Sequence, residues 1–385
     1  MNLYQVLFAL VRNQISDEEP SEEIKDFAKK YTKQLYMLAS PHGLTLLLGQ
    51  ALSDLKCLSD DPVSQKIQER NMKLFGLQMQ QEMAYAQICQ ALEAHKIPFV
   101  PLKGSVIRKY YPQSWMRTSC DIDILVGEED VSKAVELLKK QLQYRQPADR
   151  EYHDVALYSP QGVLLELHFS LKENQEKLDR VLSQAWENVA PIEGYAYEKA
   201  FTRPFLVHHI LAHCAYHFMS SGCGARPLLD LWLLKHRMGY EEESVLELCR
   251  ISGLETFYTQ IMALAEVWFA GAESNPDLDQ LAAYILNAGF GGSEENAAAA
   301  AVLKKGSKSK YILGRIFLPY DMLKEYYPAL NRHKWLMPVC QVRRWFSGIK
   351  RKRLGATLSA MKTGAEVDQE KLSQTEALFK SLKFD

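Results

Sequence analysis

An excess of charge of either sign is missing from this sequence. Its 385 residues carry 46 lysines and arginines against 47 aspartates and glutamates, a formal net charge of -1. Proteins that bind nucleic acid along its backbone usually present a broad basic field. Nucleic acid is therefore not an expected partner, although a local basic cleft is compatible with this balance.

Cysteine is scarce and scattered. The seven cysteines are odd in number and never form a C-x-x-C pair, which argues against a disulfide framework and against a cysteine metal site. We expect free thiols that behave as small core residues in a reducing compartment.

Long apolar runs are also missing. The N-terminus begins with apolar residues but has neither a basic region nor a small-residue cleavage site, so it does not resemble a signal peptide. No run approaches the roughly 20 apolar residues needed to span a bilayer. Internal repeats are absent too. We expect a cytoplasmic globular protein with no transmembrane segment.

The pattern of apolar residues and helix breakers divides the chain into four segments. Residues 1–95 form an N-terminal helical region, and residues 96–172 form a core. Residues 173–355 form a helical domain, and residues 356–385 form a peripheral tail helix. Within the first segment, Ser21 is expected to cap a helix that continues through Leu35. After the core we expect helices only, interrupted at prolines 191, 204, 227 and 276.

The core segment alternates between strand-like and helix-like patterns. Strands are predicted at 99–102, 122–126, 154–158 and 163–169, and helices at 104–111 and 128–140. This order indicates an α+β fold in which a small mixed β-sheet is flanked by N-terminal and C-terminal helical regions.

Two acids stand at the start of the second predicted strand. Asp121 and Asp123 are separated by one residue, so strand alternation points both carboxylates to the same face. Two neighbouring carboxylates repel each other unless a cation lies between them, and Mg²⁺ prefers a few carboxylates together with phosphate oxygens. A pair of exposed acids at the rim of the sheet, with no metal, is the alternative.

Further polar residues accompany this pair. Lys103, Gly104 and Ser105 lie at a strand-to-helix junction, where free N–H groups attract anions, although a simple helix cap has the same pattern. Glu166 lies within an apolar strand, on the same face as His168. A metal ligand or general base would explain this acid, and so would a salt bridge to Lys103 or Arg117.

These residues resemble the nucleotidyltransferase superfamily typified by DNA polymerase beta. Its signature of G-[GS], a spacer, D-h-D and a third acid on a later strand matches Gly104-Ser105, Asp121-Ile122-Asp123 and Glu166 in order. The spacer is longer than in the shortest members. The segment is more similar to the uncharacterised bacterial nucleotidyltransferase family with L-K-G, R-x-x-x-D-[IL]-D-[IL]-L-V and E-L-H motifs, on residues 102–104, 117–126 and 166–168.

The resemblance implies a metal-dependent transfer of a nucleotidyl group from a nucleoside triphosphate. Asp121, Asp123 and Glu166 would be the catalytic residues and the ligands of two Mg²⁺ or Mn²⁺ ions. The nucleotide-binding residues it implies are Lys103, Gly104, Ser105, Arg117 and His168. An ATP-binding site and release of pyrophosphate follow from the same comparison.

A histidine-rich helix follows the core. In the resembled family a helix with paired histidines precedes an R-x-x-x-D helix, which corresponds here to His213 and His217, then Arg226 and Asp230. All four are predicted substrate residues, and we expect His213, His217 and Asp230 to line the far wall of the cleft that contains the acids. The histidines could instead form hydrogen bonds within the helices, and Arg226 and Asp230 are also spaced for a helical ion pair.

One dense basic cluster lies at residues 343–353. It is compatible with an acidic partner, RNA or anionic lipid, or with an ordinary solvated helix face.

The favoured function is an enzyme that modifies a small-molecule hydroxyl. Modification of a protein or an RNA end, and nucleotide binding by a sensor or scaffold without turnover, are the alternatives. The acceptor, the preferred base and the oligomeric state are not predicted.

Overall fold

The computed structural model describes residues 1–147, 154–289, 292–350 and 354–384. These residues form two compact units. The first comprises the described parts of Met1–Tyr216 and Gly224–Phe290, and the second comprises His217–Cys223 and the described parts of Gly291–Asp385. The predicted division into four segments stays a prediction, because these units show which residues pack together and not which stretches fold alone.

Helices form the N-terminal part of the first unit. Their bounds are α1 Leu3–Ser16, α2 Glu22–Lys30, α3 Thr32–Ala39, α4 Thr45–Asp54 and α5 Pro62–Ala94. The Ser21 side chain caps α2 by accepting a hydrogen bond from the N–H of Ile24. The expectation that this helix continues through Leu35 is wrong. The backbone of Tyr31, at φ -119° and ψ 27°, leaves the helical region and separates α2 from α3.

A mixed four-stranded sheet follows, in the order β1-β2-β4-β3. Its strands are β1 Phe99–Pro101, β2 Asp121–Val126, β3 Asp154–Tyr158 and β4 Leu164–His168. The central strands β2 and β4 are parallel, and each edge strand is antiparallel to its neighbour. The predicted α+β fold with a small mixed sheet is therefore confirmed.

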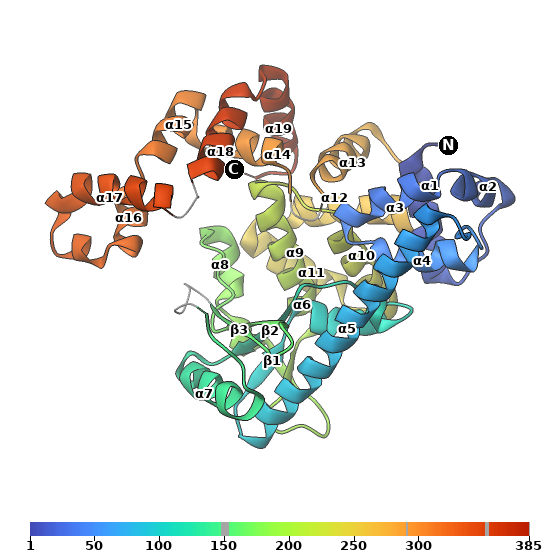
Figure 1. Ribbon diagram of the computed structural model, residues 1–385, viewed down its shortest axis with the longest axis horizontal. Helices are drawn as coiled ribbons and strands as arrows, with labels where there is room; N and C mark the ends of the chain where they lie inside the picture. Colours follow the sequence, from blue (N-terminus) through green and yellow to red (C-terminus); the bar gives the residue numbers. More distant parts are fainter. Residues whose placement is uncertain (148–153, 290–291, 351–353, 385) are drawn as a thin grey trace. The chain divides into compact units, whose positions relative to one another are not determined.

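One face of this sheet packs against two helices, α5 and α7 Val131–Leu142 (Figure 1). Alternate residues of each strand enter this core, because successive side chains of a strand point to opposite faces. Ile122 and Ile124 of β2 and Leu165 and Leu167 of β4 are all buried in it. The residues between them, which include the predicted acids, consequently belong to the opposite face.

Two short elements, α6 Lys103–Ile107 and the 3-10 turn Arg108–Tyr110, connect β1 to the loop before β2. Apart from short 3-10 and π turns, the first unit continues with α8 Glu176–Leu182, β5 Val189–Pro191, β6 Lys199–Phe201, α9 Arg203–Ser220, α10 Arg226–Leu233, α11 Glu242–Ser252, α12 Glu255–Phe269 and α13 Pro276–Ala288. The last four residues of α9 belong to the second unit.

The hairpin of β5 and β6 corrects the expectation of helices only after the core. Contacts distant in the sequence hold it. The Glu93 carboxylate accepts hydrogen bonds from the N–H groups of residues 196–198, and the N–H of Phe99 donates to the carbonyl of Tyr197. The predicted breaks at Pro204, Pro227 and Pro276 are confirmed, since each of these prolines lies in the first turn of a new helix.

The second unit is helical in the part that the structure describes. Its helices are α14 Glu294–Lys305, α15 Lys308–Ile316, α16 Tyr320–Tyr326, α17 Met337–Lys350, α18 Leu354–Glu366 and α19 Gln369–Ser381. The chain expected to form one tail helix thus forms two, α18 and α19. Ala299 of α14 is buried in a cluster with Val367 and Leu372, so the alanine-rich stretch allows close helix packing.

The basic cluster begins on α17. Arg344 donates to the carbonyl of Ile316, the Trp345 ring N–H donates to the same carbonyl, and Arg343 lies over the ring of Tyr327. Residues 351–353 of the cluster lie outside the described residues. The described part therefore has contacts within its own unit.

The expectations from scarce features were met in part. Five of the seven cysteines are buried, and Cys120 is exposed rather than a core residue. Among the described residues, no helix has both the length and the apolar character required to cross a membrane.

Candidate active site

Asp123 and Glu166 lie side by side on the sheet face opposite the helix-packed core. Parallel pairing places Asp123 of β2 directly across from Glu166 of β4. Both residues alternate with buried aliphatic neighbours, so the local pattern sends their side chains to the same face. His168 follows two residues after Glu166 and shares this face.

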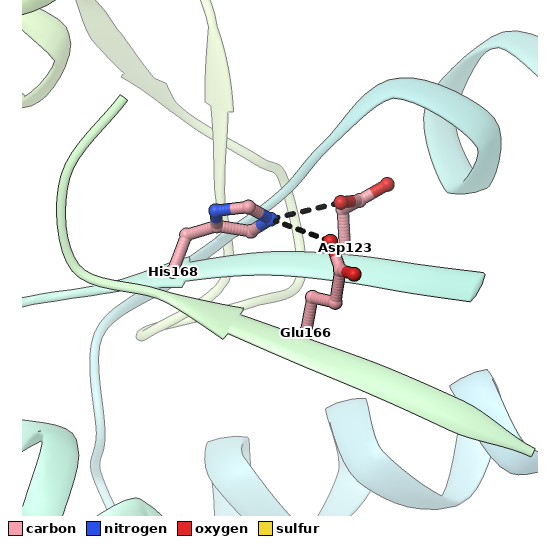
Figure 2. Close-up of side chains that lie close together, drawn as sticks. All are labelled: Asp123, Glu166 and His168. Atoms are coloured by element: carbon pink, nitrogen blue, oxygen red, sulfur yellow. Dashed lines mark hydrogen bonds and ion pairs between the residues drawn. The ribbon is translucent and has the colours of Figure 1, made fainter. Parts of the chain in front are cut away.

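His168 bridges the two carboxylates (Figure 2). Its Nε2 atom lies 2.8 Å from Oδ1 of Asp123 and 3.6 Å from Oε2 of Glu166. One ligand atom from each of the three residues lies within 4.8 Å of the others. Asp123 and His168 are buried and Glu166 is half-buried. The three side chains therefore form a compact donor group that is open at Glu166.

Lys103 adds a positive charge to this group. Its Nζ atom lies 3.2 Å from Oδ1 of Asp123. The backbone of Lys103 has φ +38°, a left-handed conformation that a residue with a side chain adopts at an energetic cost. Leu102 holds the neighbouring backbone, because its N–H donates to the carbonyl of Asp123. The strained junction thus directs the ammonium group at the acids.

The acids have unequal proton affinities. Burial raises the pKa of Asp123, but the nearby Lys103 and His168 outweigh it and the net pKa lies well below the ordinary value. Burial, and then repulsion by Asp123 and Asp121, raises the pKa of Glu166 to about 7. Asp123 is therefore ionised at neutral pH, whereas Glu166 can hold or release a proton there.

Asp121 lies at the start of β2, opposite Leu164. Burial and repulsion by Asp123 raise its pKa, so it lies within the same electrostatic environment. It is not part of the compact donor group. The alternative of two exposed acids at the rim is wrong for Asp123, which is buried, while Asp121 is half-buried.

Gly104 and Ser105 lie in α6, a helix of only five residues. A side chain at position 104 would bring its Cβ to 2.8 Å from the Nη1 atom of Arg117, closer than real Cβ contacts. Gly104 thus has a packing reason to be glycine. Ser105 is half-buried, and its predicted contact with phosphate stays a prediction.

Arg117 is held by Asp230 of α10. Its Nε and Nη2 atoms donate to the two carboxylate oxygens of Asp230 at 2.8 and 2.7 Å, and the Tyr111 hydroxyl donates to the same carboxylate at 2.7 Å. Both charged side chains are 4% exposed or less. The guanidinium group therefore anchors the loop before β2 to α10, four residues before Asp121.

The other predicted substrate residues have separate partners. Nη1 of Arg226 donates to the carbonyl of Thr118, which also belongs to the loop before β2. Nδ1 of His213 lies 3.1 Å from Oε1 of Glu173. His217 belongs to the second unit. The structure thus joins Arg226 and Asp230 to the loop that precedes the acids, and their predicted contact with substrate stays a prediction.

Two residues that the sequence did not single out support the site, and a third lies near it outside the predicted set of site residues. The side-chain amides of Gln78 and Gln81 in α5 both donate to the carbonyl of Ser119, just before β2. The sequence feature that could have identified these two glutamines is the presence of polar residues on the buried face of an amphipathic helix. His209 is buried, and neither of its ring nitrogens has a hydrogen-bond partner among the described residues. It lies on the histidine-rich helix α9. Burial lowers its pKa well below the ordinary value, and the charges of Lys103, His213, His168 and Asp123 also act on it.

The chain matches the model of a protein family described as "Uncharacterised nucleotidyltransferase" over residues 29–270. Since this match covers more than half of the chain, the protein belongs to that family, and the predicted resemblance is confirmed. No curated protein and no solved structure matches the chain.

The donor group is chemically suited to a divalent cation. Ligands in adjacent positions of an octahedral ion with bonds of 2.0–2.1 Å lie roughly 3 Å apart. The distances from Nε2 of His168 to the two carboxylate oxygens, 2.8 and 3.6 Å, bracket that value. Two carboxylates would also offset the charge of one such ion. The residues present therefore fit a bound divalent ion.

Proposed function

We propose that this nucleotidyltransferase moves a nucleoside monophosphate group from a nucleoside triphosphate, with ATP as the expected donor, to a hydroxyl group of a small-molecule acceptor. The observation that carries the proposal is the juxtaposition of Asp123, Glu166 and His168 beside Lys103. In the reaction a bond forms between the acceptor oxygen and the α-phosphorus. The bond between the α-phosphorus and the oxygen that bridges it to the β-phosphorus breaks, and pyrophosphate leaves.

Asp123, Glu166 and Asp121 are the residues assigned to hold Mg²⁺ or Mn²⁺. Bound ions supply Lewis acidity, which neutralises phosphate charge and lowers the pKa of the acceptor hydroxyl. The ordering of charge supports this assignment, because Asp123 stays ionised while Asp121 and Glu166 have raised pKa values. Two neighbouring acids with raised pKa values indicate a site that lacks positive charge.

Lys103 is assigned to the triphosphate. In the structure its ammonium group neutralises Asp123. When the charge of Asp123 is offset by a bound metal ion instead, Lys103 can turn toward the phosphate oxygens. A charge-assisted hydrogen bond to phosphate is strong. Gly104 and Ser105 follow Lys103 in α6, and His168 lies on β4 beside the acids. These three residues complete the proposed nucleotide-binding set.

If Glu166 does not bind the metal ion, it is suited instead to accept the proton of the acceptor hydroxyl. Its pKa of about 7 in the metal-free protein matches the pH at which a general base works best. Its side chain is 30% exposed, so an acceptor can reach it from solvent. Arg117, Arg226 and Asp230 act on this site by holding the loop before β2, and His213 and His217 remain the proposed acceptor contacts. The cytoplasm is the proposed compartment.

The test is an incubation of the purified chain with each α-labelled nucleoside triphosphate, Mg²⁺ or Mn²⁺, and cell extract, followed by separation into small-molecule, protein and RNA fractions. We expect label in the small-molecule fraction together with stoichiometric pyrophosphate. Label in protein or RNA would change the acceptor class. Binding without labelled product in any fraction would refute transfer and favour a nucleotide sensor.

Asp123→Asn is the decisive variant. It should abolish labelling, because metal-held charge contributes several kcal/mol to stabilising the transition state. The conservative control is Glu136→Gln, which removes an exposed ion pair with Lys140 on α7 and should label normally. Circular dichroism must show that the Asn variant is folded, since Asp123 is buried against Lys103 and His168. Retained labelling by a folded Asp123→Asn protein would refute the assigned role.

A further inference from the structure

The donor group differs from an all-carboxylate magnesium site in containing an imidazole. Nε2 of His168 is 2.8 Å from Asp123 Oδ1, closer than Lys103 Nζ at 3.2 Å. The group that lies within 4.8 Å comprises two carboxylates and one imidazole, and Asp121 is not among them. Oxygen-only sites suit Mg²⁺, whereas imidazole nitrogen favours first-row transition ions.

We propose that His168 is a nitrogen ligand of the metal ion in this site, so that the site binds Mn²⁺ and related transition ions in preference to Mg²⁺. This inference rests on the proposed function and specifies its metal. The ion would replace the hydrogen bond between His168 and Asp123, with both side chains in nearly their present positions.

His209 provides a second observation that points to a ligand. Its side chain is 3% exposed, and in the part of the chain that the structure describes neither ring nitrogen has a hydrogen-bond partner. Burial is the main influence on the pKa of this ring, followed by the charges of Lys103, His213, His168 and Asp123, so the ring lies near the same group. A buried imidazole normally has at least one partner, and a ligand or ordered water bound at this site would supply it.

The competing role for His168 is to orient Asp123 by donating a hydrogen bond through Nε2. The two roles require different ring protonation, since a metal ligand must present an unprotonated nitrogen. His168→Gln separates them, because the glutamine amide can still donate to Asp123 but has no imidazole nitrogen. Nucleotide transfer need not be measured for this distinction.

The experiment uses the full chain, freed of metal, and Mn²⁺ as the probe. Electron paramagnetic resonance titration measures Mn²⁺ affinity, competition with Mg²⁺ measures selectivity, and pulsed measurements detect coupling of the electron spin to ¹⁴N. We expect ¹⁴N coupling in the wild-type protein and its loss in His168→Gln. Loss of even an outer-shell metal partner costs roughly 10–100-fold in affinity, so Mn²⁺ affinity should fall at least about tenfold and Mg²⁺ affinity less.

His236→Gln is the matched control. Nε2 of His236 lies 2.8 Å from Oε1 of Glu266, so this pair has the imidazole–carboxylate geometry of the site without the third donor. Its replacement should change neither Mn²⁺ affinity nor the ¹⁴N signal. If His168→Gln does not fold, the ¹⁴N signal of the wild-type protein alone still tests the inference.

The failures are distinguishable. Mn²⁺ bound without ¹⁴N coupling, or equal loss of Mn²⁺ and Mg²⁺ affinity in His168→Gln, would overturn the inference and leave the proposed transfer intact. Absence of any Mn²⁺ binding, with or without a non-hydrolysable triphosphate analogue, would overturn the inference and also remove the metal from the proposed function.

Discussion

Replacing Asp230 with Asn tests whether the buried ion pair of α10 is structural. The substitution keeps the shape of the side chain but removes the charge that both donor nitrogens of Arg117 contact. Arg117 is 4% exposed and cannot lose its proton. Breaking one partner of such a pair typically costs about 3–5 kcal/mol, because the other charge stays buried without compensation.

Guanidinium unfolding followed by circular dichroism measures the change. A loss of about 3–5 kcal/mol is a large part of ordinary domain stability, so the midpoint of one transition should fall clearly. Glu136→Gln is the control, because its pair with Lys140 is exposed and worth about 0–1 kcal/mol. Replacing both partners, as in Arg117→Met with Asp230→Leu, should recover part of the loss.

Nucleotide affinity decides between the structural role and direct contact with substrate. If Asp230→Asn unfolds at the same denaturant concentration as Glu136→Gln but binds nucleoside triphosphate much more weakly, the reasoning from burial is refuted. Asp230 would then contact substrate, as the sequence alone predicted. If stability falls and the folded fraction retains its affinity, Asp230 is an anchor of the loop before β2.

Two further changes have signs that follow from the structure. Gly104→Ala should destabilise the protein by about 1–3 kcal/mol, because the new Cβ meets Arg117. Gly76→Ala, in an open part of α5, should instead stabilise it by about 0.5–1 kcal/mol. Equal effects of the two substitutions in thermal unfolding would contradict this prediction. Because the pKa of Glu166 is raised, the folded protein binds more protons than the unfolded chain between about pH 4.5 and 7. The free energy of unfolding of the metal-free protein should therefore fall as pH rises through that window. The expected fall is about 1–3 kcal/mol after allowance for the partial exposure of Glu166. Glu166→Gln should flatten the profile, and an unchanged slope in pH-dependent urea unfolding would be evidence against the raised pKa.

The sequence by itself determined the elements of the core and the composition of the site. Strand alternation separated Ile122 and Ile124 from Asp123, and it separated Leu165 and Leu167 from Glu166. This pattern is local, because the side-chain direction in a strand depends only on position along the backbone. The acids, the lysine of the junction and the α+β order were therefore readable from short segments.

The tertiary structure decided which of these residues meet and what holds them. Parallel pairing of β2 with β4 brings Asp123 opposite Glu166 and makes His168 a third donor. Arg117 meets Asp230 across 113 positions of the chain, and residues 196–198 meet Glu93 in the same long-range way. Such contacts depend on the packing of whole elements, and no spacing within a segment encodes them. For the same reason burial of Asp123, and with it the unequal pKa values of the acids, emerged only in the folded chain.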